Sequence, residues 1–311
     1  MTRKRGVFVG LTTVDLIHRI AEPVGANQKA TALGQEIVAG GPAANAAVTF
    51  ALLGGQATLV TDLGRHPLGV LAGDDLSGYG VRVRPVEPEH AGAPAVSSIR
   101  VLDGSGDRSV VSVNAAARTV AAPGWLSAVL DDAAVLLLDG HHPALAMAAA
   151  RAARTRAVPV VLDAGSWKPV LDELLPLVDT AICSGDFALP DGAPPTSLLN
   201  RGVRRVAITR GPEPILWWSV EPGERRAPGV SAEQDAVPVP PVLVRDTLGA
   251  GDVFHGAFAW HLADRPDRAF ADQLARSAVV AAARCQVAGI SAGRAQLARR
   301  SAPLEPVDPA E

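Results

Sequence analysis

The stretch Asp246-Thr247-Leu248-Gly249-Ala250-Gly251-Asp252, which continues as Val253-Phe254-His255-Gly256-Ala257, is the most informative part of this sequence. An extended, proline-broken segment precedes it, and small apolar residues with helical spacing follow it. This pattern predicts a Gly-Ala-Gly turn that opens a helix, where backbone N–H groups and the helix dipole converge on an anion without obstruction by Cβ atoms. Asp252, in the first helical turn, would stand beside that anion as a candidate general base. Phosphoryl transfer to a hydroxyl needs this combination, whereas the alternative is an ordinary helix N-terminus.

Composition limits the class of protein. The 311 residues, 48% hydrophobic and 20% charged, can bury a sizeable core in one large domain or two ordinary ones. The net charge of −3, with both signs interspersed, gives no indication of a nucleic-acid or membrane surface. Cys183 and Cys285 are far apart and form no disulfide or zinc framework. The basic start lacks a signal-length apolar segment, and no apolar run reaches the ~18–20 residues that span a bilayer, so we expect a soluble cytoplasmic protein.

The first part of the chain supplies a second glycine-rich helix start. Gly6 to Gly10 predicts a buried first strand, with Asp15 just past its carboxyl end, where ligands bind in open α/β sheets. The Asp15 carboxylate could take hydrogen bonds from two sugar hydroxyls, or it could cap a turn. Further on, Gly40-Gly41-Pro42 opens a helix from which Asn45 projects. No Gly-x-Gly-x-x-Gly follows the first strand and no P-loop motif occurs, which counts against dinucleotide-binding and P-loop folds.

Two further patterns organise the rest of the chain. Residues 96–102 and 109–113 flank a Gly-rich turn and predict a hairpin, and residues 31–38 suit a strand that leaves the main sheet. We expect these lid strands, within residues 27–39 and 96–114, to form a small sheet that closes over a ligand or meets a partner subunit. From Trp125 onwards a regular β/α pattern predicts parallel strands whose carboxyl ends form a ligand crevice. Residues 301–311 are expected to be a flexible tail.

These residues resemble the ribokinase-like, or PfkB-type, carbohydrate kinases. Asp246-Thr247-x-Gly249-Ala250-Gly251-Asp252 is similar to the C-terminal signature of that family, and Gly40-Gly41-x-x-x-Asn45 is similar to its N-terminal signature. The resemblance covers nearly the whole chain. It implies a single domain over residues 1–311, a ribokinase-like three-layer α/β/α sandwich with a mostly parallel central sheet and a small β-sheet lid. Within the family, several motifs look most similar to ketohexokinase and bacterial sulfofructose kinase.

The resemblance also implies roles in an ATP-dependent sugar kinase whose acceptor is a hydroxyl, expected to be a primary one. Asp252 would take the proton of the attacking hydroxyl, and the N–H groups of Gly249, Ala250 and Gly251 would hold the transferring phosphoryl group. The residues expected to bind the sugar are Asp15, Gly40, Gly41, Asn45 and, from the lid, Arg108. Those expected to bind ATP are Thr209, Gly211, Cys285 and Gly289. Mg²⁺ would bridge the ATP phosphates, and K⁺ or a similar ion supports the anion hole in many members; no protein ligands are assigned to either metal.

Departures from the family pattern leave the substrate open. His66 replaces the Asp of a common Gly-x-Asp-x-x-Gly motif. Asp186 is a weak substitute for the Glu of a missing Asn-x-x-Glu, and Arg210 places a charge beside the nucleotide. The cationic residues that could serve an acceptor carrying phosphate or sulfonate are Arg65, Arg100, Arg108 and His141, although each could equally be a surface residue.

Other functions remain open. A catalytically impaired sugar- or nucleotide-binding regulator on the same fold would suit the altered motifs, but the intact Asp252 turn disfavours it. A kinase for a sugar phosphate or a nucleoside is a further alternative. A pyridoxal- or hydroxymethylpyrimidine-type kinase is disfavoured by the separate lid strands. By resemblance, the lid also implies a homodimer in which two small sheets pack together.

Overall fold

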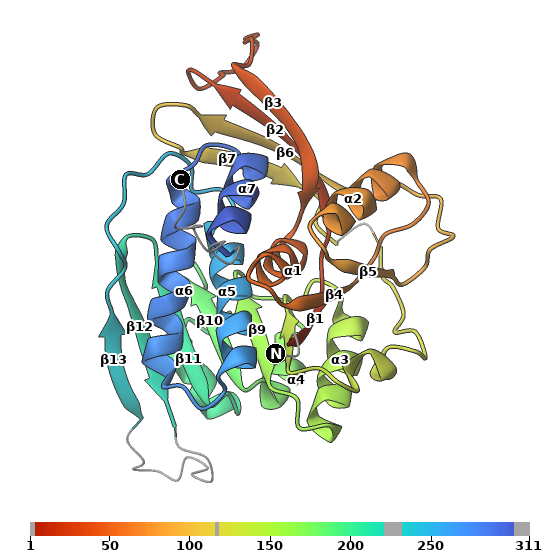
Figure 1. The fold of residues 1–311 in the computed structure, drawn as a ribbon, viewed down its shortest axis with the longest axis vertical. Helices are drawn as coiled ribbons and strands as arrows, with labels where there is room; N and C mark the ends of the chain where they lie inside the picture. Colours follow the sequence, from red (N-terminus) through yellow and green to blue (C-terminus); the bar gives the residue numbers. More distant parts are fainter. Residues whose placement is uncertain (1–3, 116–117, 221–231, 302–311) are drawn as a thin grey trace, which may run out of the picture.

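The computed structural model describes residues 4–115, 118–220 and 232–301. Within these ranges, nine strands form the main sheet in the order β13-β12-β11-β10-β9-β8-β1-β4-β5 (Figure 1). The bounds are β1 (Arg5–Val9), β4 (Gln56–Thr61), β5 (Arg82–Pro85), β8 (Val135–Leu138), β9 (Val160–Ala164), β10 (Thr180–Ser184), β11 (Arg205–Arg210), β12 (Glu213–Ser219) and β13 (Glu233–Val237). The seven neighbouring strands from β11 at one side to β5 at the far edge are all parallel. At the other edge, β12 pairs antiparallel with β11, and β13 pairs antiparallel with β12.

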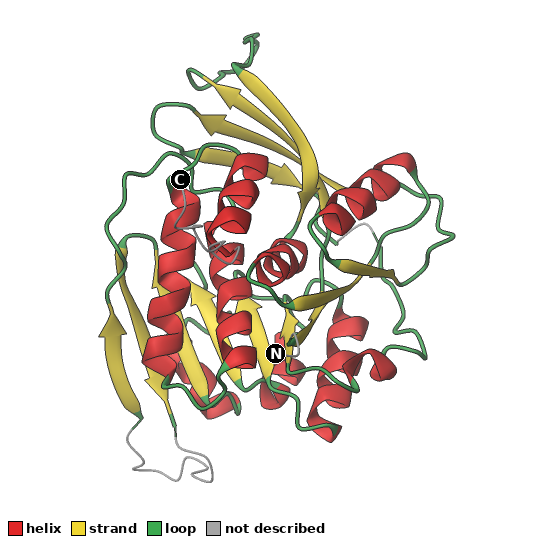
Figure 2. Ribbon diagram, in the orientation of Figure 1, coloured by secondary structure: helices red, strands yellow, loops and turns green. Residues whose placement is uncertain are grey.

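Helices cover both faces of the main sheet (Figure 2). They are α1 (Pro42–Leu52), α2 (Pro67–Gly78), α3 (Pro143–Thr155), α4 (Leu171–Leu174), α5 (Ala250–Asp264), α6 (Phe270–Cys285) and α7 (Ile290–Ser301). Because side chains alternate along a strand, Phe8 and Leu137 join the apolar core under α1, α5 and α6, whereas Val7 and Leu136 join the core under α3. The expected three-layer α/β/α sandwich with a mostly parallel sheet is confirmed.

A second sheet of four strands stands beside the carboxyl ends of the main strands, in the order β3-β2-β6-β7. Its members are β2 (Thr13–Ile20), β3 (Gly34–Gly40), β6 (Ala95–Leu102) and β7 (Arg108–Ser112). The hairpin and the strand near residues 31–38 lie where the sequence predicts them. Asp15 lies past the carboxyl end of β1, as the sequence predicts, but it belongs to a strand and does not cap a turn, because residues 13–19 pair with β3 and residues 13–20 pair with β6. Asp15 therefore belongs to the lid, on its inner face.

Helices α1 and α5 pack unusually closely because a glycine lies at their crossing. A Cβ atom added to Gly256 would lie 2.7 Å from Cβ of Thr49 and 2.9 Å from Cα of Ala46, and nearer still to the carbonyl oxygen of Ala46. No ordinary side chain fits at that separation. This contact matters for the site, since α1 carries Asn45 and α5 carries Asp252 in their first turns.

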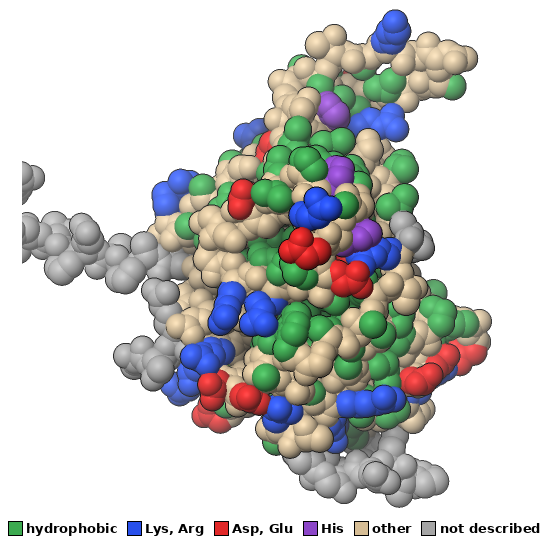
Figure 3. Space-filling model, turned by 90° about the vertical axis from the view of Figure 1, so that its right-hand side faces the viewer, with side chains coloured by type: hydrophobic (Ala, Val, Ile, Leu, Met, Phe, Trp, Pro, Cys, Tyr) green, Lys and Arg blue, Asp and Glu red, His purple; other side chains and the backbone are tan. Residues whose placement is uncertain are grey.

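Charge is distributed without a dominant sign on the surface. On the face in Figure 3, acidic and basic side chains are interspersed, as the net charge of −3 suggests. Among the described residues, no helix is both long enough and apolar enough to cross a bilayer. The expected flexible tail falls almost entirely on residues 302–311, which lie outside the described ranges.

Candidate active site

The start of α5 is anchored by the buried carboxylate of Asp246. Its Oδ1 accepts a hydrogen bond from the N–H of Leu248 at 2.9 Å, and its Oδ2 accepts one from the N–H of Gly289 at 2.9 Å. The guanidinium of Arg19, from lid strand β2, donates to the same Oδ2 at 3.0 Å, and that of Arg284 lies 3.5 Å away. Two cations and two N–H groups therefore hold this carboxylate, which is 1% exposed, and fix the loop that leads into α5.

The turn after this anchor has the geometry of an anion site. Gly249 has φ of 73°, in the left-handed region that glycine adopts without steric cost, and it immediately precedes the first helical residue, Ala250. The first N–H groups of a helix have no partner within it, and the helix dipole adds positive potential there. Gly249 and Gly251 thus offer backbone donors at the point where Asp252 enters the helix, whereas the N–H of Ala250 donates to the carbonyl oxygen of Thr247 at 3.2 Å.

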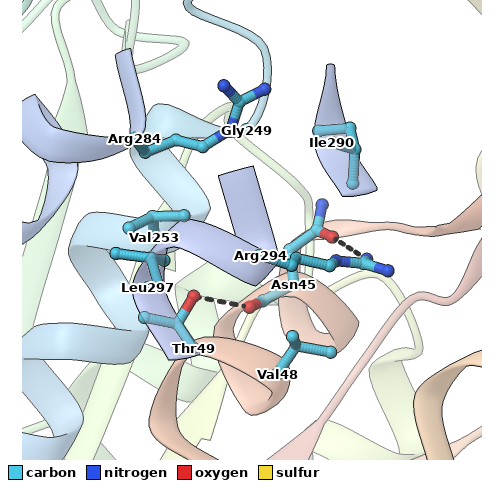
Figure 4. Close-up of a pocket in the computed structure, with 9 residues that line it drawn as sticks. All are labelled: Asn45, Val48, Thr49, Gly249, Val253, Arg284, Ile290, Arg294 and Leu297. Carbon is cyan, nitrogen blue, oxygen red and sulfur yellow. Dashed lines mark hydrogen bonds between the residues drawn. The ribbon is translucent and has the colours of Figure 1, made fainter. Parts of the chain in front are cut away.

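A chain of hydrogen bonds orients Asp252. The Nη2 of Arg294 donates to Oδ1 of Asn45 at 3.0 Å (Figure 4), and Nδ2 of Asn45 donates to Oδ2 of Asp252 at 2.7 Å. Because a guanidinium can only donate, it fixes which way the Asn45 amide points. Arg294 itself is held by Asp75, at 2.9 Å, and by the carbonyl oxygen of Ala39, at 2.7 Å. Asn45 therefore presents its amino group to Asp252.

The environment of Asp252 favours its neutral form. Burial raises its pKa to about 7, and the negative charge of Asp163 acts in the same direction. The hydrogen bond from Asn45 and the charge of His255 oppose this shift. A carboxyl group whose pKa lies near the operating pH exchanges protons effectively in both directions. Asp252 is thus suited to accept a proton from a hydroxyl group.

A cavity of about 160 Å³ opens between the lid and the start of α5. Its lining residues are Leu11, Thr13, Asp15, Ala39, Gly41, Pro42, Asn45, Ser97, Ile99, Val110, Ser112, Asn114, His141, Leu248, Gly249, Asp252 and Ile290. Five of the predicted sugar-side and catalytic residues are therefore brought together from β2 and from the starts of α1 and α5: Asp15, Gly41, Asn45, Gly249 and Asp252. Hydroxyl, amide and carboxylate groups lie here among aliphatic side chains, as is typical of a small-molecule site.

Asp15 is built into the wall of this cavity. The hydroxyl of Thr13 donates to its Oδ1 at 2.6 Å, and burial raises the pKa of Asp15 above its usual value. Gly40 is required beside it, because a Cβ atom on Gly40 would overlap the Asp15 carboxyl group. Gly41 has φ of 97° and precedes the first residue of α1. The predicted Gly-Gly motif thus seats one carboxylate and turns the chain into the helix that carries Asn45.

The residues predicted for ATP do not line this cavity. Thr209 is the penultimate residue of β11, and its hydroxyl donates to the carbonyl oxygen of Cys183 at 3.3 Å. Gly211 follows that strand with φ of 62°. The carbonyl oxygen of Cys285 accepts the N–H groups of Arg245 and Asp246, and Gly289 donates to Asp246. Cys285 and Gly289 therefore hold the segment at residues 245–246 that leads into the α5 turn. Thr209 and Gly211 lie instead at the carboxyl edge of the main sheet.

The cationic residues considered for a charged acceptor are dispersed. Arg108 donates to the Thr247 hydroxyl at 2.9 Å and does not line the cavity, and the guanidinium of Arg65 contacts the carbonyl oxygen of Glu89. Arg100 is exposed, one residue from the inward-facing Ile99, so it points away from the cavity. Of the four, His141 lines the cavity, and burial lowers its pKa below the usual value, so it is neutral at pH 7.

Two departures from the family motifs have structural positions. His66 is the N-cap of α2 and accepts the N–H of Leu68 on its Nδ1 at 3.2 Å, as an Asp would do. Asp186 is exposed in the turn after β10.

Sequence reasoning missed several supporting residues. Asp139, at the end of β8, accepts N–H groups of Leu11, Ala43 and His141 and so ties three site segments together. Asp163, at the end of β9, lies 3.4 Å from the ring of His255. Each aspartate directly follows an apolar run in the sequence, which was the available signal.

Comparison with known proteins agrees with this geometry. The pfkB family of carbohydrate kinases matches residues 3–296 of the chain. A ribokinase of Bacillus subtilis (strain 168) is 24% identical over 262 residues, which cover 83% of this chain and 86% of the relative. The solved ribokinase of Giardia lamblia is 17% identical with a TM-score of 0.79, covering 96% of this chain and 99% of that chain. Arabidopsis thaliana ribokinase, solved with ribose and ATP, is 22% identical with a TM-score of 0.73, covering 97% and 99%. The chain therefore belongs to the pfkB family of carbohydrate kinases, which are phosphotransferases that use an alcohol group as acceptor.

Proposed function

We propose that this protein transfers the γ-phosphoryl group of ATP to a hydroxyl, a primary one by preference, of a sugar or sugar derivative, with Asp252 as general base. The observation that carries the proposal is the position of the Asp252 carboxylate. It lies on the cavity wall, is oriented by Asn45 and stands at the donor-rich start of α5. The availability of ATP makes the cytoplasm the expected site of the reaction.

In the proposed reaction the sugar lies against Asp15, Asn45 and the backbone at Gly40 and Gly41. Asp252 takes the proton of the attacking hydroxyl as its oxygen bonds to the γ-phosphorus and the bond to ADP breaks. The N–H groups of Gly249, Ala250 and Gly251 would stabilise the charge on the transferring group. Such transfer depends mainly on positioning and electrostatic stabilisation, because the protein has little covalent chemistry to perform. The solved complex of Arabidopsis ribokinase with ribose and ATP supports this pair of ligands.

On the donor side, we propose that ATP lies between the edge formed by Thr209 and Gly211 and the segment from Cys285 to Gly289. The described residues include no group of three or more His, Cys, Asp or Glu side chains that could hold a metal ion. By the resemblance to the family, Mg²⁺ would arrive on the phosphates of ATP. A K⁺ requirement follows from the resemblance alone, and activity compared in KCl and in tetramethylammonium chloride would test it.

The role of Asp252 is tested by Asp252→Asn, with Asp264→Asn at the other end of α5 as the matched control. Loss of the base should lower the rate of ADP formation by roughly 10²–10⁴-fold, while ATP binding measured by calorimetry stays largely intact. The control should retain the wild-type rate. Near-normal turnover by Asp252→Asn with a confirmed sugar would refute the assignment.

The acceptor is identified by coupled ADP detection over ketohexoses, pentoses, sugar phosphates, sulfosugars and nucleosides. The similarity to ketohexokinase and sulfofructose kinase predicts a ketose, whereas the three relatives described above are ribokinases. A response confined to a sugar phosphate or a nucleoside would select that alternative. Ligand-dependent thermal stabilisation without ADP formation across the whole panel would instead favour a regulator that has lost catalysis.

The outer face of the lid supports a further proposal, a homodimer in which two lids pack together. Leu16, Ile37, Ser98 and Val111 form one cross-strand row on this face, and Ile37 and Val111 are 44% and 67% exposed. Burial of this row by a second copy would remove exposed apolar surface. Val111→Lys should shift the mass measured by light scattering toward the monomer, and Val70→Lys on α2 is the control. A monomeric wild type would refute the proposal.

A further inference from the structure

His255 has an unusual set of neighbours for a buried histidine. It lies on α5 one turn after Asp252 and is 5% exposed. Its Nδ1 is 2.7 Å from the carbonyl oxygen of Gly251 and 3.4 Å from Oδ2 of Asp163. Its Nε2 is 3.3 Å from the carbonyl oxygen of Ile182 on β10. Every polar atom that these contacts bring to the ring is therefore an oxygen that can only accept a hydrogen bond from it.

This arrangement suits only one protonation state. A neutral imidazole keeps a lone pair on one nitrogen, and either tautomer would direct that lone pair at a carbonyl oxygen. The doubly protonated ring donates from both nitrogens and satisfies all of the contacts. The nearby Asp163 carboxylate, which is also buried, supplies the opposite charge that a buried cation needs.

The charge of His255 bears directly on Asp252. The groups that face Asp252 are Asp163 from β9, Asp15 from β2, Asn45 from α1 and His255 from its own helix. Burial and the two carboxylates favour protonated Asp252, whereas Asn45 and His255 favour the ionised form. A protonated carboxyl group has no capacity to take the proton of an attacking hydroxyl.

We infer that His255 is an imidazolium in the folded protein and acts as a positioning residue that keeps Asp252 ionised near neutral pH. The inference rests on the proposed role of Asp252 as base. His255 touches neither substrate in this proposal, and it acts through the field that it exerts one helical turn away. The pair formed by Asp163 on β9 and by His255, one helical turn after Asp252 on α5, thus sets the protonation state of the base without contacting either substrate.

The charge of His255 can be read without any assay of activity. In ¹⁵N-histidine-labelled wild-type protein, long-range ¹H–¹⁵N correlation distinguishes protonated from unprotonated ring nitrogens. The His255 signals are identified by their loss in His255→Asn, and both nitrogens should be protonated at pH 7.5. His261 is a second buried histidine on α5, and neither of its ring nitrogens has a hydrogen-bond partner among the described residues. Burial lowers its pKa to about 4. It should be neutral in the same spectra, and an unprotonated nitrogen on His255 would overturn the inference.

The effect on catalysis is tested by the pH dependence of kcat/KM for the sugar. His255→Asn removes the charge but keeps a donor for the Gly251 carbonyl oxygen. The acid limb of the His255→Asn profile should move to higher pH by up to about two units, the shift for unit charges ~6 Å apart at an effective dielectric constant of about 20. His261→Asn should leave the acid limb in place, since that residue is neutral and lies more than two turns from Asp252.

The outcomes separate this inference from the proposed function. An unshifted acid limb in a folded, active His255→Asn protein overturns the positioning role while leaving the kinase proposal intact. A wild type that forms no ADP with any acceptor refutes the proposed function, and the ring protonation measured by NMR then still decides the charge of His255. Circular dichroism and thermal unfolding check that each variant is folded.

Discussion

Replacement of Gly256 by alanine should separate α1 from α5 and damage both stability and activity. The new Cβ would lie 2.7 Å from Cβ of Thr49 and 2.9 Å from Cα of Ala46. Carbon atoms pack best at about 3.5–4.0 Å, so the helices must part locally by about 0.8 Å. The obstructing atoms include the backbone of α1, which has no rotamer to change. Overpacking of this kind costs about 1–3 kcal/mol, and the better helix propensity of alanine offsets about 1 kcal/mol at most.

The matched control is Gly73→Ala in α2. Gly73 is also a helix-interior glycine, but a Cβ added there meets no atom within 4 Å. The same chemical change should therefore stabilise the protein by about 0.5–1 kcal/mol through helix propensity and reduced freedom of the unfolded chain. The two substitutions differ only in what the added methyl group meets.

Urea unfolding and calorimetry compare the two variants. The Tm of Gly256→Ala should fall by about 2–4 °C for each kcal/mol lost, and that of Gly73→Ala should rise slightly. Because Asn45 and Asp252 lie at the starts of the separated helices, kcat of the first variant should fall while kcat of the second stays unchanged. A Gly256→Ala protein at least as stable as the wild type would refute the close-packing account.

Three further predictions follow from the site. Wild-type kcat/KM for the sugar should fall tenfold per pH unit below about 7, because burial and Asp163 raise the pKa of Asp252 and only its ionised form accepts a proton. Asp15→Asn should raise Tm near pH 7 but weaken sugar binding. Burial raises the pKa of Asp15 in the folded protein, so the wild type loses stability as pH rises through that pKa and Asp15 ionises. The neutral asparagine side chain avoids this loss, so the gain in Tm should be largest near pH 7 and should shrink toward pH 4. Arg294→Lys should cost about 1–3 kcal/mol in urea unfolding, because an ammonium group cannot reach Asp75, Asn45 and the Ala39 carbonyl oxygen together. A flat pH profile would contradict the first prediction, and unchanged sugar affinity of Asp15→Asn would contradict the second. Equal stability of Arg294→Lys and wild type would contradict the third.

The parts of the site that rest on local signals could be predicted from the sequence. The turn before Asp252 and the turn before Asn45 are each marked by glycines at a helix start, and both lie where expected. The parallel core could be predicted because each buried strand is a short apolar run that ends in a polar residue. These features depend on neighbours in sequence, which is why a single chain reveals them.

The errors involve pairing between distant segments. Strand β2 pairs in parallel with β6, about 80 residues later, and no local signal specifies that partner. Asp15 was placed just past the carboxyl end of β1, with a turn cap as the alternative, and the strand formed by residues 13–20 was not predicted. Strands β12 and β13 at the sheet edge were also missed. The Asp163–His255 contact joins β9 to α5 across 92 residues, and a lone histidine in an apolar helix gives no sign of its partner.

Strand β2 carries Asp15 near its start and Arg19 four residues later on the same face. Asp15 lines the sugar cavity, and Arg19 holds the Asp246 carboxylate beneath the α5 turn. The strand between Asp15 and Arg19 spans about 13 Å with little flexibility, so displacement of one of these residues disturbs the other. Thermodynamic linkage then requires reciprocity: if nucleotide phosphates favour the loop held by Arg19, sugar and nucleotide strengthen each other's binding by the same factor. Calorimetric titration of the sugar with and without a non-hydrolysable ATP analogue measures that factor, which should approach one in Arg19→Gln.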